Sequence, residues 1–77
     1  MGAIMQQIQR RMIAYTVACV NEFAKRKVLH PQKAFFYLDR YEGIKFLKEN
    51  YEIEHTLSME DAVDDLEMVC RNNGGAL

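Results

Sequence analysis

The clearest hydrophobic pattern lies in the N-terminal third of the chain. Apolar side chains recur there every three or four residues, at Ile8, Met12, Tyr15, Cys19 and Phe23. This spacing places them on one face of an α-helix that is predicted to run from about Ala3 to Lys27. Four more apolar residues widen the face: Ile13, Val17, Val20 and Ala24. The middle of this helix is apolar nearly all round, which is typical of a helix at the centre of a fold or in an interface.

Two more helices are predicted in the middle of the chain. Residues before a proline avoid the α region and proline suits the first helical position, so a second helix should begin at Pro31. Its apolar face has Ala34, Phe35, Leu38 and Tyr41. Gly43 should end or sharply turn this helix. A short third helix is then marked by Ile44, Leu47 and Tyr51.

The last third of the chain predicts a connector and a final helix. Apolar and polar residues alternate from Tyr51 to Leu57, which predicts an extended connector or an isolated strand. Ser58, followed by Asp61 three residues later, resembles a helix N-cap. The final helix ends near residue 72, and its buried stripe has Met59, Ala62, Val63, Leu66, Val69 and Cys70. The whole pattern predicts one all-α domain over residues 1–77, with three to four helices, the first of them long, and a short extended connector before the last.

The small size of the chain favours association. Its 77 residues are 49% apolar, which is enough for a core and too much for a disordered chain. A chain this short buries only about 60% of the surface that its unfolded form exposes, so its stability is marginal. Self-association or a permanent partner commonly offsets this, and we expect a homo-oligomer or a complex with another protein.

Charge is divided unevenly along the chain. Residues 1–48 carry a net charge of +6 and residues 49–77 carry −7, although the total is only −1. Such a division can place opposite charges on different faces and favour binding to a charged partner. The alternative is that the two halves neutralise one another within the fold.

Two features bear on the cellular location. Arg10 and Arg11 precede a short apolar run and resemble the start of a signal peptide, but the run is too short for that role or for spanning a bilayer. Cys19 and Cys70 lack a CxxC spacing and lie in apolar helical stripes, which is typical of buried, reduced thiols. One disulfide between them stays possible. We therefore expect a cytoplasmic protein that does not bind a membrane.

Catalytic and metal sites find little support in the sequence. The few hydroxyl and imidazole side chains near one another fit structural roles, such as that of Ser58 as a helix cap, so no catalytic triad is expected. Structural zinc sites use closely spaced ligand pairs, whereas the thiols and imidazoles are scattered over Cys19, His30, His55 and Cys70. We therefore expect no enzyme activity, no metal site and no cofactor.

Two kinds of binding surface are suggested instead. A helix, a turn at Gly43 and a second helix, with Lys33, Arg40, Lys45 and Lys48 on the polar sides, could imitate a DNA-binding helix-turn-helix. The predicted second helix of that unit is short, and a pI near 6.1 argues against strong phosphate binding. The other is aromatic. Phe36, Tyr37 and Phe46 cannot all share the core face, so some aromatic surface should remain for a partner or for a second copy.

The residues in order resemble the bacterial domain-of-unknown-function family 3791. The resemblance covers about residues 12–75, and its most specific part is the string from Tyr51 to Ser58. It implies a short cytosolic protein whose gene often lies beside a second family that looks like ADP-ribosyltransferases. That arrangement resembles a toxin–antitoxin operon in which the small helical protein neutralises the toxin.

The resemblance and the charge pattern lead to one hypothesis about the site. A toxin that uses NAD must hold a pyrophosphate, usually with positive groups, so an acidic face of the antitoxin could occupy that cleft. Tyrosines are common anchors at such interfaces. The predicted partner-binding residues are Tyr37, Tyr41, Tyr51, Glu52, Glu54, Asp61, Asp64 and Asp65. A helical DNA-binding transcriptional regulator is the alternative.

Overall fold

The chain folds entirely into helices and turns over the part that we can describe. The computed structural model describes the backbone of residues 2–77 and the side chains from residue 5 onward, and this part contains no strand. Its five helices are α1 (Gly2–Lys27), α2 (Pro31–Arg40), α3 (Gly43–Glu49), α4 (Tyr51–Glu54) and α5 (Met59–Asn72). The predicted all-α class, the long first helix and the start of the second helix at Pro31 are confirmed. The predicted number of helices, three to four, is one or two too low.

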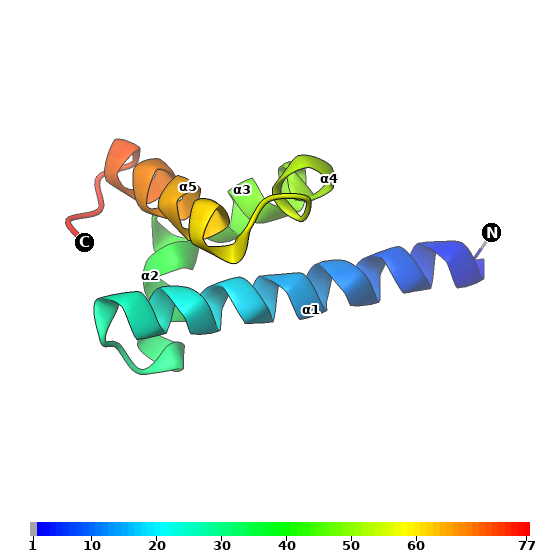
Figure 1. Ribbon diagram of the computed structural model, residues 1–77, viewed down its shortest axis with the longest axis horizontal. Coiled ribbons are helices and arrows are strands. Elements are labelled where there is room, and N and C mark those ends of the chain that lie inside the picture. Colours follow the sequence, from blue (N-terminus) through cyan, green and yellow to red (C-terminus); the bar gives the residue numbers. More distant parts are fainter. Residues whose placement is uncertain (1) are drawn as a thin grey trace.

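The long helix α1 forms a base on which the other helices lie (Figure 1). At 1.5 Å per residue its 26 residues extend about 39 Å, which is close to the longest dimension of the molecule, 41 Å. Helices α2, α3 and α5 all contact α1. The buried side chains of α1 lie between Cys19 and Ala24, whereas residues 5–11 are all exposed. The N-terminal half of α1 therefore runs past the packed part of the fold.

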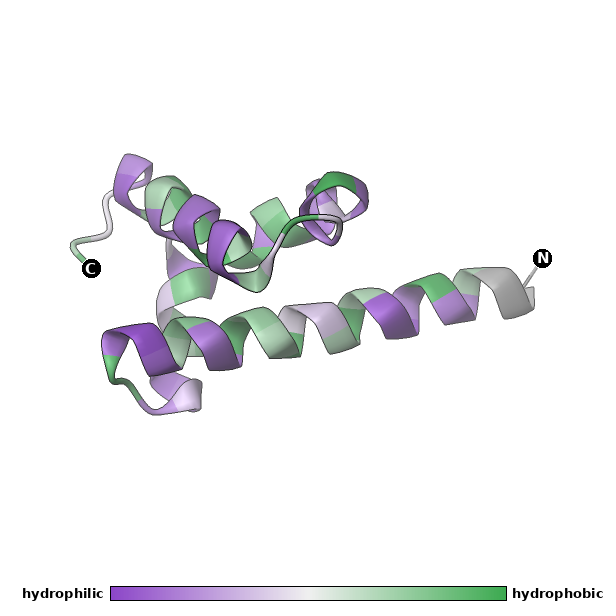
Figure 2. Cartoon of the chain, in the orientation of Figure 1, coloured by the Kyte–Doolittle hydropathy of each residue, from purple (hydrophilic) through white to green (hydrophobic). Residues whose placement is uncertain are grey.

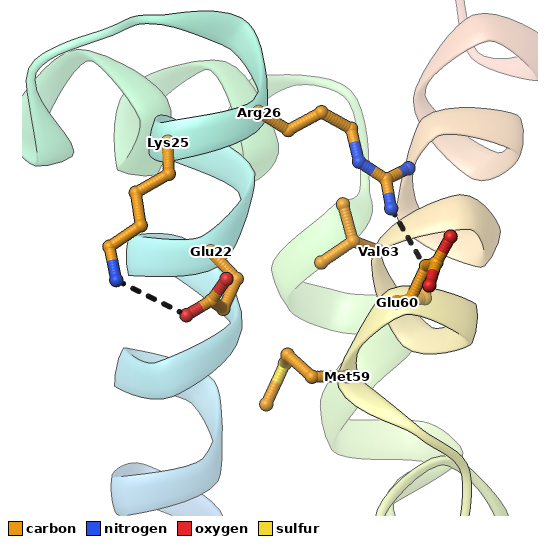
Figure 3. Close-up of a pocket in the computed structure, with 6 residues that line it drawn as sticks. All are labelled: Glu22, Lys25, Arg26, Met59, Glu60 and Val63. Atoms are coloured by element: carbon orange, nitrogen blue, oxygen red, sulfur yellow. Dashed lines mark hydrogen bonds and ion pairs between the residues drawn. The ribbon is translucent and has the colours of Figure 1, made fainter.

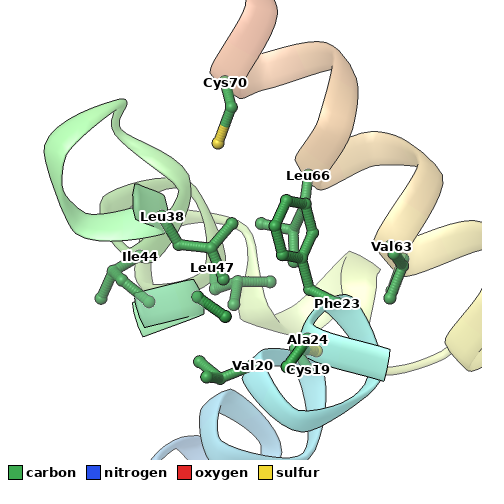
Figure 4. Close-up of a cluster of buried hydrophobic side chains, with 12 residues drawn as sticks. Cys19, Val20, Phe23, Ala24, Leu38, Ile44, Leu47, Val63, Leu66 and Cys70 are labelled. Carbon is green, nitrogen blue, oxygen red and sulfur yellow. The ribbon is translucent and has the colours of Figure 1, made fainter. Parts of the chain in front are cut away.

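One core joins α1, α2, α3 and α5. Figure 4 shows their side chains pointing into a shared interior, and Figure 2 shows green, apolar segments of the helices turned toward it. The largest fully buried side chains are Phe23, Leu38, Leu47 and Leu66. The core comprises twelve buried residues: Cys19, Val20, Phe23, Ala24, Ala34, Leu38, Ile44, Leu47, Ala62, Val63, Leu66 and Cys70.

Four residues of the predicted apolar faces are exposed, among them Ile8 at 44%. Ile13 is 64% exposed, Val17 53% and Phe35 40%. Ile13 and Val17 lie on the flank of α1, which the shorter helices do not cover. The predicted widening of the α1 face is therefore correct only for Val20 and Ala24, which are buried.

The predicted extended connector is wrong, because Tyr51–Glu54 forms the helix α4 and two turns follow it. The backbone N–H groups of Glu54 and His55 donate to the carbonyl oxygens of Asn50 and Tyr51, at 2.9 and 3.0 Å. In this helix a charged residue points inward and an apolar one outward, since Glu54 is 4% exposed and Ile53 is 67% exposed. The alternation of polar and apolar residues in the sequence resembles that of a strand, although the segment is helical.

Local capping explains where the helices begin. The hydroxyl Oγ of Ser58 accepts a hydrogen bond from the backbone N–H of Asp61 at 3.0 Å, which confirms the predicted cap of α5. Gly43 does not terminate α2 but begins α3, and Glu42 before it has a φ of 72°. A Cβ on Gly43 would lie 3.0 Å from the side chain of Leu38, so glycine permits the close approach of α2 and α3.

Candidate functional site

The residues predicted to bind a partner fall into separate regions of the fold. Tyr37 lies on α2, and Tyr41 directly follows the last residue of this helix. The ring of Tyr37 stacks on Phe23 at 5.7 Å and contacts the ring of Tyr41 at 4.9 Å. Its hydroxyl also accepts a hydrogen bond from the backbone N–H of Leu77 at 3.1 Å. Tyr37 therefore bonds the C-terminal tail, and the ring of Tyr41 lies beside Gly74 in that tail.

A second region lies between α1, α4 and α5, where Glu54 is buried, Tyr15 and Tyr51 are half-buried and His55 is exposed. The ring of Tyr51 packs edge-on against Tyr15 at 5.6 Å and stacks on His55 at 4.5 Å. The hydroxyl of Tyr15 donates to the backbone carbonyl of Glu54 at 2.9 Å, and burial raises the pKa of this hydroxyl. Tyr15, which the sequence did not single out as a site residue, links α1 to α4.

The buried carboxyl group of Glu54 belongs to this second region. Its Oε1 has no hydrogen-bond partner, and burial together with the neighbouring carboxylate of Asp65 raises its pKa from the ordinary value to about 7. A protonated Glu54 can donate to Asp65, whereas an ionised one is repelled by it. Glu54 therefore lies inside the fold, not on an acidic outer surface.

A third region joins α1 to α5 through ion pairs. Arg26 pairs with Asp64 and with Glu67, and Lys27 lies 2.9 Å from Glu67. The Lys27 ammonium and the Arg26 guanidinium lower the pKa of Glu67. Arg71 approaches the same carboxylate at 3.8 Å. The basic end of α1 therefore neutralises part of the acidic C-terminal half of the chain. These ion pairs could not be predicted from the sequence, because the sequence does not show that α1 and α5 are adjacent.

Among the described side chains, the exposed carboxylates without an ion pair fall into two groups: one on α4 and in the first turn of α5, and another, Asp39 and Glu42, on and after α2. Glu52, Glu60 and Asp61 are all exposed, and we call these three residues the acidic edge. Among the side chains described, no cation lies within 4 Å of the carboxylate oxygens of these three residues, although Arg26 bonds the backbone carbonyl of Glu60. Four residues join α4 to α5, so the two parts of the acidic edge are neighbours along the chain. Of the predicted binding residues, Glu52 and Asp61 are the acids free to meet a partner.

One residue of the acidic edge, Glu60, also lines a shallow hollow between α1 and α5. Figure 3 shows its lining, with Arg26 reaching from α1 toward α5 and Met59 and Val63 forming the floor. Arg26 donates to the backbone carbonyl of Glu60 at 3.2 Å, and Lys25 pairs with Glu22 at 3.4 Å. The hollow measures about 350 Å³ and its six lining residues include no hydroxyl, thiol or imidazole. Its chemistry suits charge recognition.

The thiols and imidazoles occupy structural positions. Cys19 and Cys70 are both free and fully buried, and burial raises the pKa of each thiol, that of Cys70 to about 11. His30 caps α2 by accepting from the backbone N–H of Gln32, and His55 stacks on Tyr51. Within the part of the chain that the structure describes, no three potential ligands gather as a metal site would require.

Comparison with known proteins identifies the family. Residues 14–73 match the family model described as Protein of unknown function (DUF3791). The chain belongs to this family. The match confirms the resemblance inferred from the sequence and runs from the middle of α1 to the end of α5, so the acidic edge lies within the DUF3791 domain. No curated protein and no solved structure shows significant similarity to the chain. None of the helices in residues 2–77 has the length and apolarity needed to cross a bilayer.

Proposed function

We propose that the protein is a non-enzymatic protein-binding module that neutralises an ADP-ribosyltransferase-like toxin. The observation that supports this proposal is the acidic edge, an exposed group of carboxylates without ion pairs among the described side chains. A toxin that binds NAD holds a pyrophosphate, which usually requires positively charged groups. Carboxylates that enter such a cleft complement its charge and exclude the dinucleotide.

An aromatic anchor lies beside the acidic edge. Tyr51 precedes Glu52 on α4 and is half-buried, with its ring held between Tyr15 and His55. Aromatic side chains that are already fixed lose little conformational entropy on binding, and they are enriched among residues that dominate interface energies. Tyr51 and Glu52 together thus provide an apolar contact and a charge in one place. Tyr37 and Tyr41 have a second role at the C-terminal tail, which the hydroxyl of Tyr37 bonds.

The test is a binding titration with the proposed partner, an ADP-ribosyltransferase-like protein of the kind that the family resemblance leads us to expect beside this gene. The double variant Glu52→Lys/Asp61→Lys should raise the dissociation constant about 100-fold or more, since like charges facing each other across an interface cost several kcal/mol. The matched control is Asp39→Lys/Glu42→Lys, which changes the charge equally at two exposed positions on and after α2. Equal loss of affinity in both variants, or no loss in the first, contradicts the proposal. Thermal melting of each variant separates binding defects from unfolding.

The DNA-binding alternative is tested by titrating the same chain with duplex DNA at two salt concentrations. Helix α3 is only seven residues long, and Lys45 on it lies 3.9 Å from Glu49. A recognition helix of that length offers few residues to a major groove. Tight binding of duplex DNA that weakens steeply with salt would favour a regulator over the proposed module.

A further inference from the structure

The N-terminal half of α1 exposes an apolar face beyond the rest of the fold. Figure 1 shows this half, in blue, running past α4, and Figure 2 shows apolar segments along it. Met5 is 61% exposed, Ile8 44% and Ile13 64%. These apolar side chains therefore remain open to water in the single copy, although Ile8 and Met12 also line a hollow beside α4.

The spacing of the exposed residues is that of a helix that docks into a groove. Met5, Ile8 and Met12 stand at positions i, i+3 and i+7, so their side chains lie on one face of α1. Helices that bind in apolar grooves present anchors at this spacing. Methionine side chains adapt to irregular apolar surfaces, which suits two of the three anchors to such a role.

A groove of matching chemistry lies on the same molecule. It is a hollow of about 510 Å³ between α1, α2 and α3, lined mainly by apolar side chains. Its apolar lining comprises Met12, Ile13, Val17, Phe35 and Ile44. Met12 belongs both to the anchors and to the lining, so the docking face and the groove are continuous along α1.

We propose that a second copy of the chain covers this groove. The anchors Met5, Ile8 and Met12 of each copy enter the groove of the other, with the two α1 helices antiparallel and a two-fold axis near Arg11. Because α1 carries the anchors and also part of the lining (Met12, Ile13 and Val17), one such pairing brings the anchors of each copy to the groove of the other, as a two-fold interface requires. An antiparallel arrangement places Met5 opposite Val17 of the other copy.

The area is sufficient for a dimer. An apolar side chain of this size at about half exposure leaves on the order of 100 Å² open to water. The anchors and the exposed lining residues therefore offer roughly 500 Å² per copy, or about 1,000 Å² in the pair before any polar rim is counted, which is the lower bound for a specific interface. This pairing is tested on the chain alone and so does not depend on the proposed toxin partner, although Glu52 lines a hollow together with the anchors Ile8 and Met12.

The first test is the oligomeric state of the full chain by sedimentation equilibrium. The wild-type chain should be a dimer, and Ile8→Glu/Ile13→Glu should weaken the dimer about 100-fold or more, since each change buries a charge in an apolar interface. Both residues are exposed in the single copy, so the core is not altered. The control Met68→Glu, at a residue 60% exposed on α5, should leave the dimer intact. A monomeric wild-type chain, or a dimer that survives the double substitution, overturns the proposal.

The second test measures the geometry with spin labels on introduced cysteines. Labels at Gln9→Cys lie near the axis and should give a short distance between copies. Labels at Asn21→Cys lie ten residues from the axis, so the antiparallel pairing separates their backbones by about 30 Å along the helices. The native thiols of Cys19 and Cys70 are buried and should not react under native conditions. Similar short distances at both positions would indicate parallel helices and contradict the pairing.

Discussion

Substitution of the buried acid by its amide, Glu54→Gln, should stabilise the protein in a way that depends on pH. The unfolded chain ionises this carboxyl group near its ordinary pKa of 4.5, whereas burial and Asp65 raise the pKa in the folded protein to about 7. Between these values the folded state holds a proton that the unfolded state has released. The contribution of Glu54 to the free energy of unfolding therefore falls as pH rises through this interval.

The magnitude follows from the same two values. The difference corresponds to roughly 3 kcal/mol, which is lost in full only above pH 7. Glutamine has nearly the same shape, carries no charge and can donate from its amide to Asp65, as the protonated acid does. We expect Glu54→Gln to match the wild type near pH 5 and to be more stable by about 1–3 kcal/mol near pH 8.

Urea unfolding followed by far-ultraviolet circular dichroism at the two pH values measures this difference. The control Glu52→Gln alters an exposed carboxylate on the same helix and should change the stability by less than about 0.5 kcal/mol at either pH. Parallel stability curves for Glu54→Gln and the wild type, or a loss of stability near pH 8, would refute the reasoning that a buried carboxylate beside Asp65 destabilises the fold.

Three further predictions concern packing, capping and burial. Gly43→Ala should lower the free energy of unfolding by about 1–3 kcal/mol in urea titrations, because its Cβ would lie 3.0 Å from the side chain of Leu38 and 3.1 Å from its carbonyl oxygen. Ser58→Ala should cost about 1 kcal/mol in the same assay by removing the cap of α5, whereas Thr56→Ala, at an exposed turn, should cost less. Cys70 should resist alkylation near pH 8 until the protein unfolds, because burial raises its pKa to about 11, and rapid modification of the native protein would contradict its placement in the core.

The elements that obey simple local rules were predictable from the sequence. Pro31 and Ser58 fix the starts of α2 and α5 through backbone chemistry that does not depend on the rest of the fold. The buried part of α1, from Cys19 to Ala24, follows from helical periodicity alone. The helix α4 could not be predicted from the hydrophobic pattern, because Glu54 points into the fold while Ile53 faces solvent. No periodicity argument anticipates a buried acid whose backbone carbonyl accepts a hydrogen bond from Tyr15.

The candidate site was predictable in composition but not in arrangement. The uneven charge of the chain indicated an acidic surface, and Glu52 and Asp61 are exposed on it. Which carboxylates remain without an ion pair depends on how α1 packs against α5, since Arg26 of α1 pairs with Asp64 of α5. Long-range pairing of this kind is decided by tertiary contacts. The sequence alone therefore left open whether the opposite charges meet inside the fold or face a partner, and the structure shows that some of them meet.

Inhibition of an ADP-ribosyltransferase-like protein, the proposed partner, tests the proposed function most directly. ADP-ribosyl transfer from NAD would be measured while the purified chain is added in increasing amounts. The rate of ADP-ribosyl transfer should fall to its background at a fixed small ratio of chain to enzyme. The variant Glu52→Lys/Asp61→Lys should inhibit only at far higher concentrations of the chain. Undiminished transfer in the presence of a large excess of the folded chain would contradict the proposed function.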